Sequence, residues 1–128
     1  MPARILIIED DSASRALVGY LLETSGYTTL EAEDGSVGLR MALHAQPDLI
    51  ICDLQMPQMN GYELTRALQE HPGWHRVPLI AVTAFSMAGD RETALAAGFD
   101  EHITKPIMPE TFVGQVEAFL PPTLRARH

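Results

Sequence analysis

Several short apolar runs of this chain end abruptly in a polar side chain. The runs cover residues 5–8, 49–52, 79–82 and 103–104, and the polar residues that follow them are Glu9, Asp53, Thr83 and Lys105. Short, continuous apolar runs are typical of buried strands in a parallel sheet. Ligands of open α/β sheets bind just beyond the carboxyl ends of the strands, so these polar residues should meet at one edge. The pattern therefore predicts a small site for a divalent cation and a phosphoryl group.

Length and charge indicate a single acidic domain. The chain has 128 residues, with nine basic against seventeen acidic ones and a formal net charge of −8. This balance argues against direct DNA binding and against an anionic membrane surface, since both need clustered Lys and Arg. The sequence shows no membrane span and no signal-peptide pattern, and its single Cys52 is expected in the core, which favours a cytoplasmic location. One domain is expected over residues 1–121, followed by a frayed tail over residues 122–128.

Helix signals alternate with the strand signals. A weak second strand is expected at residues 28–32, and helices are expected to begin near Ser12, Ser36, Asn60, Ser86 and Pro109. Ser and Asn are good N-terminal caps, and Pro suits a first helical turn. Glu63 gives the helix after Asn60 a capping box.

Helix ends and apolar faces follow from the same pattern. Gly26 and Gly98 are expected to end the first and fourth helices. The predicted inward face of the first helix consists of Ala13, Leu17, Tyr20 and Leu21. That of the last helix consists of Phe112, Val113, Val116, Phe119 and Leu120.

Regular strand–helix alternation predicts an α/β fold. Right-handed crossovers give a doubly wound five-stranded parallel sheet with five helices on both faces. The second and fifth strands are the least apolar and suit the edges. We therefore expect the flavodoxin-like strand order 2-1-3-4-5, with the ligand site at the ends of the first and third strands.

Three carboxylates are expected to converge at that site: Glu9, Asp10 and Asp53. Their mutual repulsion would be relieved by a hard cation such as Mg²⁺, which prefers oxygen ligands. An aspartate can attack phosphorus and become an acyl phosphate. Lys105 and Thr83 can then offset and hydrogen-bond the phosphoryl oxygens. Taken singly, each of these residues could merely end a strand at a solvated turn, but their joint placement favours the site.

Five motifs together make the chain resemble the CheY-like receiver domains of bacterial two-component response regulators, over essentially its whole length. They are the acidic pair Glu9-Asp10 with Asp11 and Arg15, the loop DLQMPQMNG at 53–61 with Glu63, VTA at 82–84, AGFD at 97–100, and Lys105-Pro106. The fold expected from the strand pattern is also the fold of this family.

The resemblance implies a role for each site residue. Asp53 would accept a phosphoryl group from a histidine kinase or a histidine phosphotransfer protein. Glu9, Asp10, Asp53 and the backbone carbonyl of Gln55 would hold Mg²⁺, and Thr83 and Lys105 would contact the phosphoryl group. The family usually has a cis peptide before its proline, here Pro106. Such a domain is not an enzyme in the usual sense, since it catalyses only its own phosphorylation and dephosphorylation.

The resemblance also points to an output surface. A downstream effector would dock on the face formed by the fourth helix, the fifth strand and the fifth helix. The family usually carries an aromatic switch residue three positions before the lysine, and His102 stands there. His102 is either a solvated polar residue on an edge strand or a pH-sensitive switch that moves with Thr83. Phe85, two residues after Thr83, is expected to shield the acyl phosphate and slow its hydrolysis.

Other classes fit less well. A haloacid-dehalogenase-type hydrolase needs a second acid two residues after its nucleophile, where Gln55 stands, and flavodoxins or dinucleotide folds need a different loop after the first strand. The start at Met1 and the short tail favour a stand-alone regulator. Residues 77–107 further resemble single-domain regulators of cell polarity and division, and also hybrid-kinase receivers. The alternative function is therefore a hybrid-kinase receiver or a phosphorelay intermediate that passes the phosphoryl group onward.

Overall fold

The computed structural model describes residues 2–84 and 87–126. Its centre is one parallel sheet of five strands in the order β2-β1-β3-β4-β5, as the sequence predicts. The strands are β1 (Arg4–Ile8), β2 (Thr28–Ala32), β3 (Leu49–Asp53), β4 (Leu79–Thr83) and β5 (Glu101–Thr104). All strands run the same way, so their carboxyl ends share one edge.

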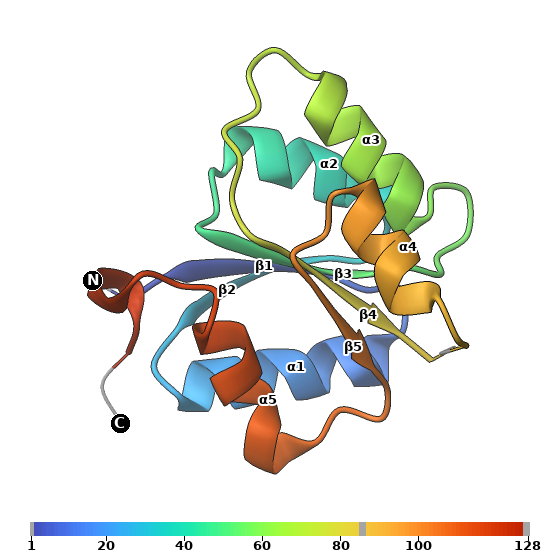
Figure 1. Ribbon diagram of the computed structural model, residues 1–128. Helices are drawn as coiled ribbons and strands as arrows, with labels where there is room; N and C mark the ends of the chain where they lie inside the picture. The colour runs from blue at the N-terminus through green and yellow to red at the C-terminus, as the bar shows by residue number, and fades with distance from the viewer. Residues whose placement is uncertain (1, 85–86, 127–128) are drawn as a thin grey trace.

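Five α-helices cover the two faces of the sheet (Figure 1). One face carries α1 (Ser12–Thr24) and α5 (Pro109–Glu117). The other carries α2 (Gly35–His44), α3 (Gly61–Glu70) and α4 (Asp90–Ala97). Across residues 2–84 and 87–126, no helix has the length and apolar character needed to cross a lipid bilayer.

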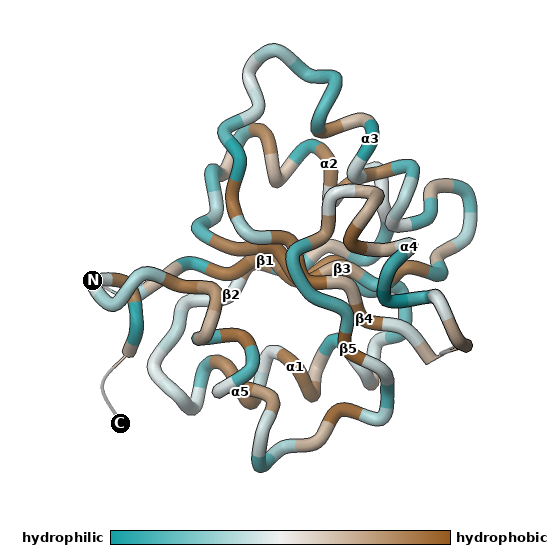
Figure 2. The backbone as a smooth tube through the Cα atoms, viewed as in Figure 1, coloured by the Kyte–Doolittle hydropathy of each residue, from teal (hydrophilic) through white to brown (hydrophobic). Residues whose placement is uncertain are grey.

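The side chains of each strand alternate between two hydrophobic cores. Along β1, Ile5 and Ile7 pack with α1 and α5, whereas Leu6 and Ile8 pack with the opposite helices. Every residue of the two central strands β3 and β4 is buried. Figure 2 shows the hydrophobic residues concentrated along these inner strands. Burial on both faces explains why the strands read as continuous apolar runs.

The predicted inward face of α1 is wrong by one residue. Leu17 and Tyr20 are exposed, with 38% and 64% of their surface accessible, whereas Val18 and Leu22 are buried against the sheet. The cap differs too: the carboxylate of Asp11, not the hydroxyl of Ser12, accepts the backbone N–H of Ser14 at 2.8 Å. Two adjacent apolar stripes exist on this helix, and the turn after β1 decides which of them meets the sheet.

Other helix signals are borne out in part. The Asn60–Glu63 capping box is formed in both directions, at 2.9 and 3.0 Å, and Pro109 occupies the first turn of α5. Helix α2 begins one residue earlier than expected, because Asp34 caps it. Helix α4 begins at Asp90 after Gly89, and the proposed cap Ser86 lies outside the described residues.

The faces and ends of the helices largely follow the sequence. The expected apolar face of α5 packs on the core through Phe112, Val113, Val116, Phe119 and Leu120. Gly26 and Gly98 stand at the ends of α1 and α4 with positive φ angles, which glycine tolerates best.

The segment after α5 differs from the frayed tail that the sequence suggests. Pro122–Leu124 form a short 3₁₀ turn, and Leu124 packs against the core. The carbonyl of Leu124 accepts the N–H of Ala3 at 2.8 Å, and the N–H of Ala126 donates to the Tyr27 hydroxyl at 3.0 Å. These contacts satisfy backbone groups that would otherwise need water, so residues 122–126 are held against the domain.

Candidate functional site

Two neighbouring strands bring the three predicted acids together. β1 and β3 pair with Ile8 beside Cys52, so Glu9 and Asp53 follow at the same level of the sheet. One carboxylate oxygen each from Glu9, Asp10 and Asp53 lies within 4.8 Å of the other two. Glu9 and Asp53 are buried and Asp10 is exposed. A cluster of carboxylates this tight, open to solvent on one side, has the donor chemistry that Mg²⁺ prefers.

Lys105 enters the cluster from the loop after β5. Its Nζ lies 2.8 Å from Glu9 Oε1 and 3.8 Å from Asp53 Oδ2. Its backbone N–H donates to the carbonyl of Thr83 at 2.8 Å, and the Lys105–Pro106 peptide bond is cis, as expected. The ammonium group therefore stands beside the position where a phosphoryl group on Asp53 would carry its charge.

The acids and the lysine change one another's protonation. Burial, together with the neighbouring Glu9 carboxylate, raises the pKa of Asp53 to about 7. Burial alone would raise the pKa of Glu9, but its hydrogen bonds with Asp53 and Lys105 hold it below the usual value. Burial alone would lower the pKa of Lys105, but the same carboxylates hold it above its usual value. Without a cation, the two buried carboxylates therefore compete for charge, and Lys105 favours Glu9.

The loop after β3 wraps closely around Asp53. The backbone N–H of Gln55 donates to Asp53 Oδ1 at 3.1 Å. The N–H of Gly61 donates to the Leu54 carbonyl at 3.0 Å. A Cβ on residue 61 would lie only 2.9 Å from the Asp53 carbonyl oxygen, so only glycine lets α3 start this close to the phosphoacceptor position.

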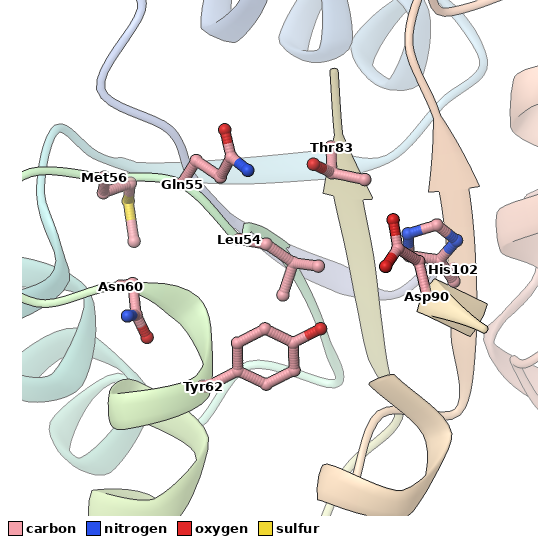
Figure 3. Close-up of a pocket in the computed structure, with 8 residues that line it drawn as sticks. All are labelled: Leu54, Gln55, Met56, Asn60, Tyr62, Thr83, Asp90 and His102. Carbon is pink, nitrogen blue, oxygen red and sulfur yellow. The ribbon is translucent and has the colours of Figure 1, made fainter. Parts of the chain in front are cut away.

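A cavity of about 510 Å³ opens beside the acids, between the N-termini of α3 and α4 (Figure 3). Gln55 and Thr83 lie along one side of it, Tyr62 lies on the opposite side, and Asp90 and His102 lie together at one end. Thr83 itself is buried at the end of β4. The cavity gives Thr83 and His102 a shared space in which side chains can rearrange.

His102 is half-buried on β5, and its Nε2 atom is buried without a hydrogen-bond partner among the described residues. A fully solvated polar residue would not leave this atom unpaired, since water would bind it. Phe85, the expected shield, lies outside the described residues.

The sequence anticipates most of this site. Glu9, Asp10, Asp53 and Lys105 come together, with Thr83 and Gln55 beside them. Sequence reasoning missed Tyr62 and Asp90, which line the cavity from α3 and α4, because no motif marks them. It also noted Arg15 without a role, although Arg15 Nη1 donates to the Glu9 carbonyl at 2.8 Å.

Comparison with known proteins gives one consistent answer. Residues 5–117 match the family model described as the response regulator receiver domain. Among curated proteins, the polar-differentiation response regulator DivK of Brucella anthropi is 37% identical over 120 residues, covering 94% of this chain and 98% of DivK.

Solved structures agree with the sequence relatives. The chemotaxis protein CheY4 of Vibrio cholerae has a TM-score of 0.86 and 28% identity, covering 94% of this chain and 100% of that one. The receiver domain of sensor histidine kinase PA1611 from Pseudomonas aeruginosa has a TM-score of 0.83 and 29% identity, covering 93% and 98%. That structure holds a magnesium ion in its active-site cleft. By fold, family match and relatives, this chain belongs to the response regulator receiver domain family of two-component systems.

Proposed function

We propose that Asp53 is the phosphoacceptor of this receiver domain and that Mg²⁺ is its cofactor. Glu9, Asp10, Asp53 and the backbone carbonyl of Gln55 would hold the ion. The cluster of three carboxylates supports this proposal, as does the magnesium in the PA1611 receiver. We place the domain at residues 1–121 and its site of action in the cytoplasm.

In the proposed reaction, a carboxylate oxygen of Asp53 attacks the phosphorus of a phosphohistidine. A P–O bond forms as the P–N bond breaks, and the histidine nitrogen leaves with the electron pair of that bond. When bound, Mg²⁺ supplies charge stabilisation to the phosphoryl oxygens. Lys105 moves its charge from Glu9 towards the new phosphoryl group, and the Thr83 hydroxyl donates a hydrogen bond to it.

The observation that carries this proposal is the 2.8 and 3.8 Å approach of Lys105 to the Glu9 and Asp53 carboxylates. With acetyl phosphate and Mg²⁺, we expect the protein to gain one phosphoryl group, detected by intact-protein mass spectrometry. A chelator in place of Mg²⁺ should prevent the gain. Equal uptake with and without the metal would rule out the magnesium-dependent function.

We further propose that output leaves through the face of α4, β5 and α5, with His102 as the switch. His102 shares the cavity with Thr83, and its unpaired Nε2 can gain a partner when Thr83 moves. In two-dimensional NMR spectra, phosphorylation should shift the amide signals of this face. His102→Ala should weaken the shifts, and His102→Tyr should retain them. Unchanged shifts in His102→Ala would reduce His102 to a surface residue.

A second candidate is onward transfer to a phosphotransfer histidine. It is favoured by likeness to receivers of histidine kinases, such as one from Syntrophus aciditrophicus at 35% identity and a TM-score of 0.81, which covers 92% of this chain and 89% of that one. Incubating the phosphorylated protein with a histidine phosphotransfer domain distinguishes the two. Rapid loss of the phosphoryl group to that domain indicates a relay, whereas retention indicates a terminal output.

A further inference from the structure

Arg15 connects three elements just behind the acid pair. Its Nη1 donates to the backbone carbonyl of Glu9 at 2.8 Å, and its Nε lies 3.3 Å from Glu31 Oε1 on β2. The Arg15 side chain is only 19% exposed. One guanidinium therefore joins α1, the end of β1 and the edge strand.

The surroundings fit this contact closely. Gly19 lies one helical turn after Arg15, and a Cβ there would be 3.3 Å from Glu31 Oε2. The bare glycine thus leaves room for the Glu31 carboxylate against α1, where it can hold the arginine. On its other side, the Glu9 N–H donates to the carbonyl of Ala32 at 3.0 Å, so both backbone groups of Glu9 are fixed.

We propose that Arg15 is a positioning residue for magnesium binding, acting through Glu9. By fixing the Glu9 carbonyl, it sets the direction in which the Glu9 and Asp10 side chains leave the strand end. This role rests on the proposed magnesium site. Groups that orient metal ligands commonly contribute about tenfold or more to affinity.

Charge alone predicts the opposite effect. Arg15 carries a positive charge close to a cation site, so a purely electrostatic role would make its removal tighten Mg²⁺ binding. A positioning role makes removal weaken binding. Arg15→Lys keeps the charge but replaces the planar fork with a single point donor, which cannot hold both partners.

The chain supplies a matched control. Arg76 also binds a carbonyl and a carboxylate, through Nη1 to Val77 at 3.0 Å and Nη2 to Asp100 at 2.7 Å. Val77 precedes β4, so these contacts lie at the amino end of the sheet, away from the acids. Arg76→Met therefore removes the same kind of interaction without touching the site.

The test is the Mg²⁺ dissociation constant, measured without phosphodonor by NMR titration of the amides of Asp10 and Gln55. We expect about tenfold weaker binding for Arg15→Met and about threefold weaker for Arg15→Lys, with Arg76→Met like wild type. Unchanged binding in Arg15→Lys, or tighter binding in Arg15→Met, would overturn the proposal.

Two further readings keep the result decisive. Thermal unfolding of each variant shows whether the fold survives, and if Arg15→Met does not fold, Arg15→Lys decides alone. A wild-type protein that binds no Mg²⁺ would remove the proposed function itself, whereas normal wild-type affinity with unaltered Arg15 variants would remove only the role of Arg15.

Discussion

Asp53→Asn is expected to abolish phosphoryl uptake. An amide is a far poorer nucleophile than a carboxylate, so the rate should fall by at least about a thousandfold, or about 4 kcal/mol of barrier. The fold should persist, because the asparagine Oδ1 can still accept the Gln55 N–H that now binds Asp53 Oδ1. Mass spectrometry after acetyl phosphate treatment measures the effect.

The same variant should change stability in a pH-dependent way. Burial raises the pKa of Asp53 to about 7, so the folded protein retains a proton that the unfolded chain has already lost. Stability from this group is therefore present at low pH and is lost as pH rises towards and through about 7. In metal-free buffer, Asp53→Asn should raise the unfolding temperature at pH 8 more than at pH 5.

Glu70→Gln is a suitable control for both effects, because Glu70 is an exposed acid at the far end of α3. It should take up phosphoryl groups like wild type. Persistent uptake by Asp53→Asn at the wild-type rate would show that the phosphoacceptor lies elsewhere.

Neutralising the acid pair, Glu9→Gln with Asp10→Asn, is expected to abolish Mg²⁺ binding. Two of the three clustered carboxylates then lose their charge, and hard cations bind neutral amides much more weakly. Affinity should fall by at least about a hundredfold, as measured by isothermal titration calorimetry. Undiminished affinity in the double variant would contradict the assigned ligands.

The single variants should separate metal binding from stability. Asp10→Asn removes an exposed charge beside two buried carboxylates and leaves the 2.8 Å Lys105–Glu9 pair intact, so it should stabilise the metal-free protein slightly. Glu9→Gln breaks that pair and should destabilise it. Chemical unfolding in metal-free buffer measures both signs, and equal effects would mean that Lys105 contributes nothing through Glu9.

The meeting of Glu9 with Asp53 was predictable, because parallel strands that end in polar residues must present them at one edge. The rotation of α1 was not, since Leu17 and Val18 are equally apolar and the Asp11 cap, a tertiary choice, selects between them. The preference of Lys105 for Glu9 depends on the path of the loop after β5. Periodicity carries no information about that path.

Contacts between distant segments were equally out of reach. Tyr27 and Ala126 are 99 residues apart, and nothing in either local sequence marks the hydrogen bond between them. Prolines at 121 and 122 suggested a chain leaving the domain. They instead turn it back into a short 3₁₀ segment.

This return of the chain places its two ends beside each other. Ala3 and Leu124 are directly hydrogen-bonded at the amino end of β1, and the acids lie at the carboxyl end of the same strand (Figure 1). A fluorescent protein or surface anchor fused to either end would therefore sit across the sheet from Asp53. Such fusions should leave the phosphoacceptor open to its donors, and a short linker between the ends would allow circular permutation within a surface loop.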